Sequence, residues 1–134
     1  MATERTAFLT IENLTAGEAI AQHTVVYLKS DGKVYNVDSA AIPPTGTARE
    51  AAAASGDRID VALHAASRKV KAGGTCTIGS LLEVTTGGLA IDVTTDNNNW
   101  VLGMCLETVA TGQFTSYIPI MTADTDDVSA VDAD

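Results

Sequence analysis

The sequence feature that most constrains the fold is a β-hairpin pattern centred on Asp31-Gly32. The stretch 24–37 reads Thr-Val-Val-Tyr-Leu-Lys-Ser-Asp-Gly-Lys-Val-Tyr-Asn-Val, so two β-prone runs flank a short polar segment. Gly adopts a positive φ without steric cost, Asp tolerates it, and Asp-Gly between two such runs is typical of a tight hairpin turn. The pattern predicts two antiparallel strands joined at Gly32.

The hairpin pattern occurs a second time, 56 residues further along the chain. Residues 80–93 read Ser-Leu-Leu-Glu-Val-Thr-Thr-Gly-Gly-Leu-Ala-Ile-Asp-Val, which places Gly88 opposite Gly32. At the same offset Gly112 stands opposite Gly56. The sequence therefore predicts two pseudo-repeated β-hairpin units, at about residues 14–69 and 70–122.

The composition favours strands over helices. Hydrophobic residues make up 46% of the chain but aromatic residues only 4%, so a core would consist mainly of small and β-branched side chains. We expect about four short strands in each unit. One such unit alone cannot bury a two-sided core, so the prediction is a single all-β domain over 14–122, a small barrel or a sandwich.

The termini differ from this body of the chain. Residues 1–13 are expected to form a flexible N-terminal arm or an edge strand, with a strand over 7–11, followed by a turn over 13–20. Residues 123–134 are expected to form a flexible acidic tail, because the last twelve residues hold five Asp and no basic residue.

Within the body, residues 39–47 read as a loop, and residues 47–52 as a strand of small residues followed by a turn at 55–57. The stretch 58–63 alternates cleanly and is expected to point Ile59, Val61 and Leu63 inward. For its counterpart at 114–120 we expect a slip in register that turns Ile118 and Ile120 inward, with Pro119 at a sheet edge or a strand end.

The net charge is −9 at pH 7, and −4 remains when the tail's −5 is removed (−9 + 5). A chain of this charge is repelled by phosphate backbones, which argues against direct nucleic-acid binding. No apolar stretch approaches the roughly 20 residues that span a bilayer, so no membrane contact is expected. The N-terminus lacks a secretory signal pattern, which indicates synthesis and folding in a cytosol.

The sequence shows no set of residues that would carry catalysis. His23 and His64 are each interpreted as solvent-facing residues beside a strand, and Asp124, Asp126 and Asp127 lack the Gly and Glu of a calcium loop. We therefore expect no enzyme activity, no catalytic residues, no metal site and no cofactor.

Three further residues attract attention. Cys76 and Cys105 are interpreted as small buried residues, although a disulfide between them stays open. Trp100 is expected to lie in the core or to close the end of a strand, with an interface anchor as the alternative.

The strand-and-turn pattern resembles that of tailed-bacteriophage capsid decoration (cement, or head-stabilising) proteins. The likeness begins at Gly17-Glu-Ala-Ile-Ala and continues through Val25-Val-Tyr to Asp31-Gly-Lys-Val-Tyr35. It returns in the second half at 72–73, 79–90 and 101–112. The stretch 47–51 and the Asp-rich tail depart from the family pattern.

The resemblance implies a structural virion protein that binds the outer surface of a phage capsid and cements neighbouring capsomers of the mature head. It implies the major capsid protein as partner, a homo-oligomer with a trimer favoured, and synthesis in the cytoplasm of a host bacterium. The candidate contact segments are 7–11, 39–47 and 122–134. The alternative is another virion or surface β-module, such as part of a tail or spike, with glycan binding as one role.

Overall fold

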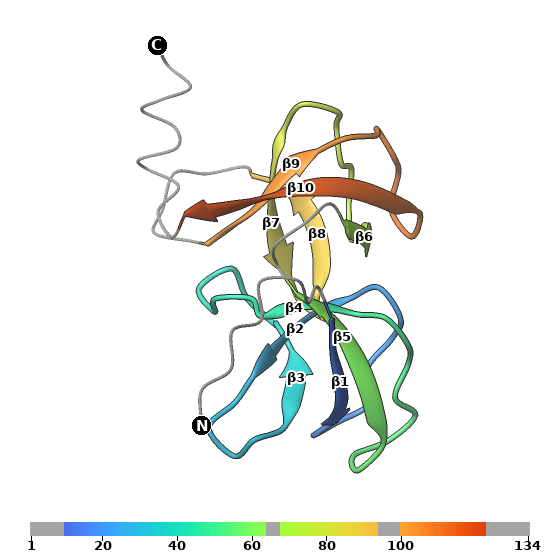
Figure 1. Cartoon of the computed structure of the whole chain (residues 1–134). Coiled ribbons are helices and arrows are strands. Elements are labelled where there is room, and N and C mark those ends of the chain that lie inside the picture. Colours follow the sequence, from blue (N-terminus) through green and yellow to red (C-terminus); the bar gives the residue numbers. More distant parts are fainter. Residues whose placement is uncertain (1–9, 64–67, 94–99, 123–134) are drawn as a thin grey trace.

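The computed structural model describes residues 10–63, 68–93 and 100–122, and over these ranges the chain consists of strands, turns and loops without a helix (Figure 1). The N-terminal arm before Thr10 and the acidic tail at 123–134 lie outside the described residues. The all-β prediction is confirmed.

Within the described residues, ten strands form two five-stranded antiparallel sheets, one from each half of the chain. The bounds are β1 Thr10–Thr15, β2 Val25–Leu28, β3 Val34–Asn36, β4 Gly46–Ala48, β5 Arg58–Leu63, β6 Arg68–Lys71, β7 Leu81–Thr85, β8 Leu89–Asp92, β9 Val101–Cys105 and β10 Phe114–Thr122. The expectation of about four strands per unit falls short by one, because β1 lies mostly within the predicted N-terminal arm at 1–13 and β6 spans the predicted boundary between the units at 69–70.

Each sheet curls into a small barrel. The strand orders are β1-β5-β4-β2-β3 and β6-β10-β9-β7-β8. In both, the two outermost strands of the order meet through one parallel bridge, Ala16 with Val34 and Ala72 with Ala90. The architecture is therefore two similar small barrels in sequence along one chain.

The two barrels have equivalent hydrogen bonds as well as the same strand order. The Ala16 amide donates to the Asp57 carbonyl at 2.8 Å, and 56 residues later the Ala72 amide donates to the Gln113 carbonyl at 2.8 Å. Around β4 and β9 the offset becomes 57, so that Gly46 corresponds to Gly103. A Cβ on Gly46 would lie 2.0 Å from the Ala62 oxygen, and one on Gly103 would lie 2.1 Å from the Ile118 oxygen.

Both predicted hairpins are present. β2 pairs with β3 around Gly32, which has a φ of 83°, and β7 pairs with β8 around Gly88, which has a φ of 75°. These are backbone conformations that favour glycine, as the Asp-Gly and Gly-Gly sequences indicated.

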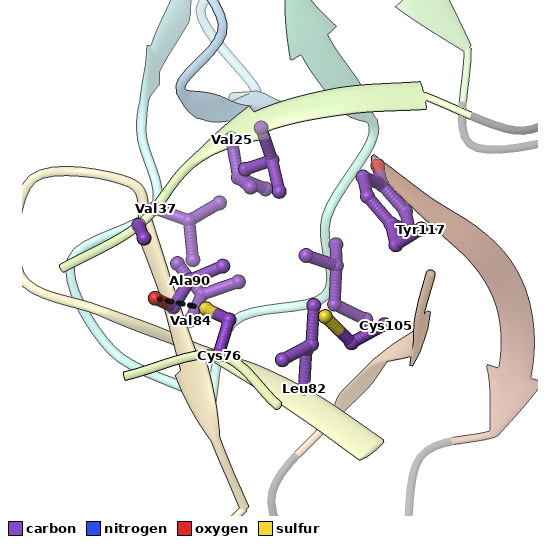
Figure 2. Packing of buried hydrophobic residues seen from close by; sticks show 11 residues of the cluster. Val25, Val37, Cys76, Leu82, Val84, Ala90, Cys105 and Tyr117 are labelled. Atoms are coloured by element: carbon purple, nitrogen blue, oxygen red, sulfur yellow. Dashed lines mark hydrogen bonds between the residues drawn. The ribbon is translucent and has the colours of Figure 1, made fainter. Parts of the chain in front are cut away.

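Each barrel has its own hydrophobic core, and β2 contributes to both. Val26 faces the interior of the first barrel, where Ile59 and Val61 pack against it. Val25 faces the other way, into the core of the second barrel with Leu82 and Val84 (Figure 2). Since neighbouring residues of a strand point to opposite sides, β2 is buried on both.

The second hairpin joins the barrels. In Figure 1, β7 and β8 reach down to the first barrel, while the turn between β2 and β3 lies at the far end of the molecule. The Val25 amide donates to the Gly88 carbonyl at 2.8 Å, and the Gly88 amide donates to the Val37 carbonyl at 2.9 Å. The Gly87 amide reaches the Asp38 carboxylate at 3.1 Å.

The expected slip in register at 114–120 is wrong. Thr115 and Tyr117 are buried, whereas the Ile118 side chain is exposed and Ile120 is half-buried. β10 keeps the register of β5, because Tyr117 pairs with Cys105 as Val61 pairs with Ala48. The hydrophobicity of Ile118 suggested the slip, but the backbone pairing decides which face is inside.

Pro119 does not lie on an edge strand, since β10 is paired on both sides, with β6 and with β9. The pairing with β6 ends at Tyr117, however, so Pro119 lies beyond the end of that neighbour. This is the strand-end position that a residue without an amide proton can occupy.

Other strand boundaries also differ from those that the sequence predicts. The strand predicted at 7–11 is described from Thr10 onward and continues to Thr15, so it includes the start of the predicted turn at 13–20. Over Thr10–Thr15 the chain lies at one end of the strand order of the first sheet, and it is bent at Asn13, where the φ is 61° and the register shifts. The strand expected at 47–52 is shorter, Gly46–Ala48, and Ala52 forms an isolated bridge with Ile20.

Candidate functional site

The histidines do not form a catalytic site in the described structure. His23 is half-buried where the barrels meet, and its ring makes an edge contact with Phe114, with centroids 5.3 Å apart. Burial, and secondarily the charge of Lys69, lower the pKa of His23. The interpretation of His23 as solvent-facing is therefore wrong, because the second barrel packs over it. His64 lies outside the described residues.

Acidic residues supply no metal site in the parts of the chain that the structure describes: no three His, Cys, Asp or Glu side chains gather there as ligands. The Asp124-to-Asp127 stretch falls beyond these parts. Likewise, none of the described residues belongs to a helix that is long and apolar enough to cross a bilayer.

Both cysteines are buried, as expected, and both are free thiols. They belong to the core of the second barrel (Figure 2). The Cys76 thiol donates to the Ala90 carbonyl at 3.3 Å, and the Cys105 thiol contacts the Glu107 carbonyl at 3.1 Å. Their role in the structure is packing.

Trp100 directly precedes β9 and is half-buried. Its amide donates to the Ala40 carbonyl of the first barrel at 2.7 Å. The strand-end position that the sequence predicted is therefore observed, and the residue's backbone ties the two barrels together.

The three predicted contact segments differ in how far the structure explains them. In the loop at 39–47, Ala40 is buried and Ile42 packs on the second barrel's core, so part of this loop is structural, while Pro43 is exposed. Of the segment 7–11, Thr10 and Ile11 lie in the half-exposed start of β1. The segment 122–134 is described only at the backbone of Thr122, the last residue of β10.

An apolar surface on the second barrel is not predicted by the sequence patterns. Several large hydrophobic side chains are exposed there: Ile78, Met104, Leu106, Phe114 and Ile118. Met104 and Ile118 are cross-strand partners on β9 and β10. An unslipped comparison of 114–120 with 58–63 would have found Ile118, because it then corresponds to the outward position Ala62.

Comparisons with known proteins agree with this architecture. Residues 4–63 match the family model described as phage cement protein, and this stretch includes β1 to β5. Among solved structures, the chain is similar to the head fiber gp8.5 N base in bacteriophage phi29, with a TM-score of 0.70 and 19% identity over 85% of this chain and 97% of that one. At this identity the likeness shows the fold. No curated protein sequence gave a significant match.

The double-barrel fold and the family match support a structural protein associated with a phage head. The resemblance to the phage capsid decoration family, drawn from the hairpin sequences, is confirmed.

Proposed function

We propose that the protein binds the outer surface of a phage capsid and stabilises the mature head by cementing neighbouring capsomers. The observation that carries the proposal is the match of residues 4–63 to the phage cement protein family. The partner is the major capsid protein, and the chain is made in the cytoplasm of the host bacterium before it joins the virion. Its role is structural and not enzymatic.

The charge suits this role. A net charge of −9 keeps a small protein soluble before assembly and repels it from the packaged DNA. Binding would then be directed to protein on the shell. A homo-oligomer, with a trimer favoured, engages several equivalent sites at once, so a modest affinity per site is enough.

The edge strand β1 is the proposed contact with the shell. It pairs along its length with β5, and on its other side it meets β3 at the single bridge from Ala16. An edge strand presents backbone donors and acceptors to which a strand of a partner can be added. Residues 1–9 directly precede this strand in the sequence, and the family match includes most of them. We propose that this arm and the start of β1 bind the capsid protein together.

The test is to mix the purified chain with expanded, undecorated heads and to measure bound copies and the temperature at which the heads release DNA. We expect saturable, stoichiometric binding and a raised release temperature. A chain lacking residues 1–9 should bind less, whereas Ala54→Asp, at an exposed turn outside the three candidate contact segments, should bind as the native chain does. Absence of binding to every head form would overturn the proposal.

A second function is favoured by the likeness to the phi29 head fiber base. In that alternative the double barrel anchors a projecting component of the virion and does not strengthen the shell. Glycan binding is one role that such a component could have. Heads that bind the protein at full stoichiometry without any gain in thermal resistance would favour this reading.

A further inference from the structure

The outer face of the first barrel is buried by the second. Val25, Thr47 and Ala62 lie side by side across β2, β4 and β5, where Val25 pairs with Thr47 and Thr47 with Ala62. They are 0%, 2% and 6% exposed. Val25 packs in the second barrel's core, and β6 passes beside β4, where the Lys71 amide donates to the His23 carbonyl at 2.9 Å.

In the second barrel, no described residue covers the corresponding row completely. Leu81, Met104 and Ile118 occupy the equivalent positions, because Leu81 pairs with Met104 and Met104 with Ile118. Met104 is 39% exposed and Ile118 is 49% exposed. We call these three residues the open face. They are larger than their counterparts in the first barrel, so the row offers more apolar area.

For the hairpins the burial is reversed: the hairpin of the second barrel is buried, and that of the first barrel is exposed. Val84 of the second hairpin is 4% exposed and packs in the shared core, whereas its counterpart Leu28 on the first hairpin is 47% exposed. A Cβ on Gly88 would lie 2.5 Å from the Val25 oxygen, but one on Gly32 would meet nothing within 4 Å. We call the exposed residues 28–33 the free hairpin. It lies at the end of the molecule away from the second barrel (Figure 1).

We propose that the free hairpin of one copy docks on the open face of the next, head to tail, in the way that the second hairpin docks on the first barrel within the chain. A single molecule carries both halves of this contact, and the internal junction shows that such barrels can pack in this arrangement. This favours a second copy over an unrelated partner. A head-to-tail contact forms a ring where the rotation closes and a filament where it does not.

The charged residues of the two surfaces agree with this arrangement, and they also limit the affinity between copies. The free hairpin carries Lys29 and Lys33, and the exposed carboxylate of Glu107 follows β9 next to the open face in a chain of net charge −9. Lys33 stands where the second hairpin has Leu89, so the contact between copies buries less apolar surface than the internal one. We therefore expect assembly that depends on concentration. The proposal goes beyond the capsid-binding function and does not depend on it.

The test uses the full chain without heads, by sedimentation velocity over a concentration series. The native protein should form larger species reversibly as its concentration rises. Leu28→Asp and Ile118→Asp should each raise the dissociation constant roughly tenfold or more, since a charge enters an apolar contact. Ala54→Asp, at an exposed turn outside both surfaces, is the matched control. Cooperative urea unfolding of each variant verifies folding.

Mixing the two variants gives the decisive result. Leu28→Asp keeps an intact open face and Ile118→Asp keeps an intact free hairpin, so the mixture should form a one-to-one dimer that grows no further. Native protein that stays monomeric to near-millimolar concentration would overturn the proposal, as would a mixture that forms no dimer. Failure here would leave head binding measurable by itself, so the two proposals can be told apart.

Discussion

The amide of Val25 in the first barrel donates a 2.8 Å hydrogen bond to the carbonyl of Gly88 in the turn of the second. The bond places a hairpin turn of one barrel directly on the backbone of the other. No side chain can stand between them, because a Cβ on Gly88 would lie 2.5 Å from the Val25 oxygen. The junction of the two barrels therefore depends on a glycine.

Gly88→Ala should destabilise the protein by more than about 2 kcal/mol, because a steric clash adds to the cost of a left-handed backbone for Ala. Gly32→Ala is the matched control. It has a similar positive φ but free space around it, so its cost should be about 1 kcal/mol. Urea unfolding measures both, and equal losses would show that the junction tolerates the added methyl group.

His23 has a φ of 63°, and its counterpart in the second barrel is Gly79, with a φ of 82°. His23→Gly and His23→Ala both remove the ring contact with Phe114. The difference between their free energies of unfolding therefore reports the strain of the backbone alone. His23→Gly should be the more stable by about 1 kcal/mol, since Ala is strained at this φ. Urea unfolding of both variants under the same conditions provides the comparison. If Ala proved as stable as Gly, the positive φ would carry no strain.

The thiol of Cys76 should resist modification in the folded protein. Burial, followed by the charges of Cys105 and Asp92, raises the pKa of Cys76 to about 12. Native protein at pH 8 should therefore react with a thiol reagent far more slowly than protein unfolded in urea.

The same shift in pKa predicts how stability depends on pH. The unfolded chain loses the Cys76 proton near pH 8.5, while the folded chain retains it. The stability that the protonated Cys76 contributes to the folded state is therefore fully present below that pH. It is lost as the pH rises toward about 12. Cys76→Ala should flatten the alkaline part of the stability curve, and an unchanged slope would contradict the prediction.

Deleting residues 123–134 should leave the double barrel folded. The described strands end with β10 at Thr122, and the deleted stretch is too polar to form a core. We expect an unfolding midpoint in urea close to that of the full chain. A truncated protein without cooperative unfolding would show that the tail belongs to the domain.

The sequence predicted the hairpins well because Asp-Gly and Gly-Gly determine turn geometry locally. It failed at Ile118, where hydrophobicity suggested a buried residue and the strand register turned that residue outward. It also failed at His23, whose surroundings are created by the packing of the second barrel. Local patterns do not contain either piece of information, since both arise from contacts between segments distant in the chain. The open face was missed for the same reason.

Each barrel closes through one parallel bridge, and this bridge is where we expect the barrel to open locally. The seam in the first barrel is the hydrogen bond from the Gly17 amide to the Val34 carbonyl, and in the second that from the Gly73 amide to the Ala90 carbonyl. Tyr35 covers the first seam and Leu89 the second, at distances that leave no room for a side chain on either glycine. A seam one bridge wide can part while the remaining strand pairs stay closed, so these two amides should exchange with solvent through local opening, well before either barrel unfolds.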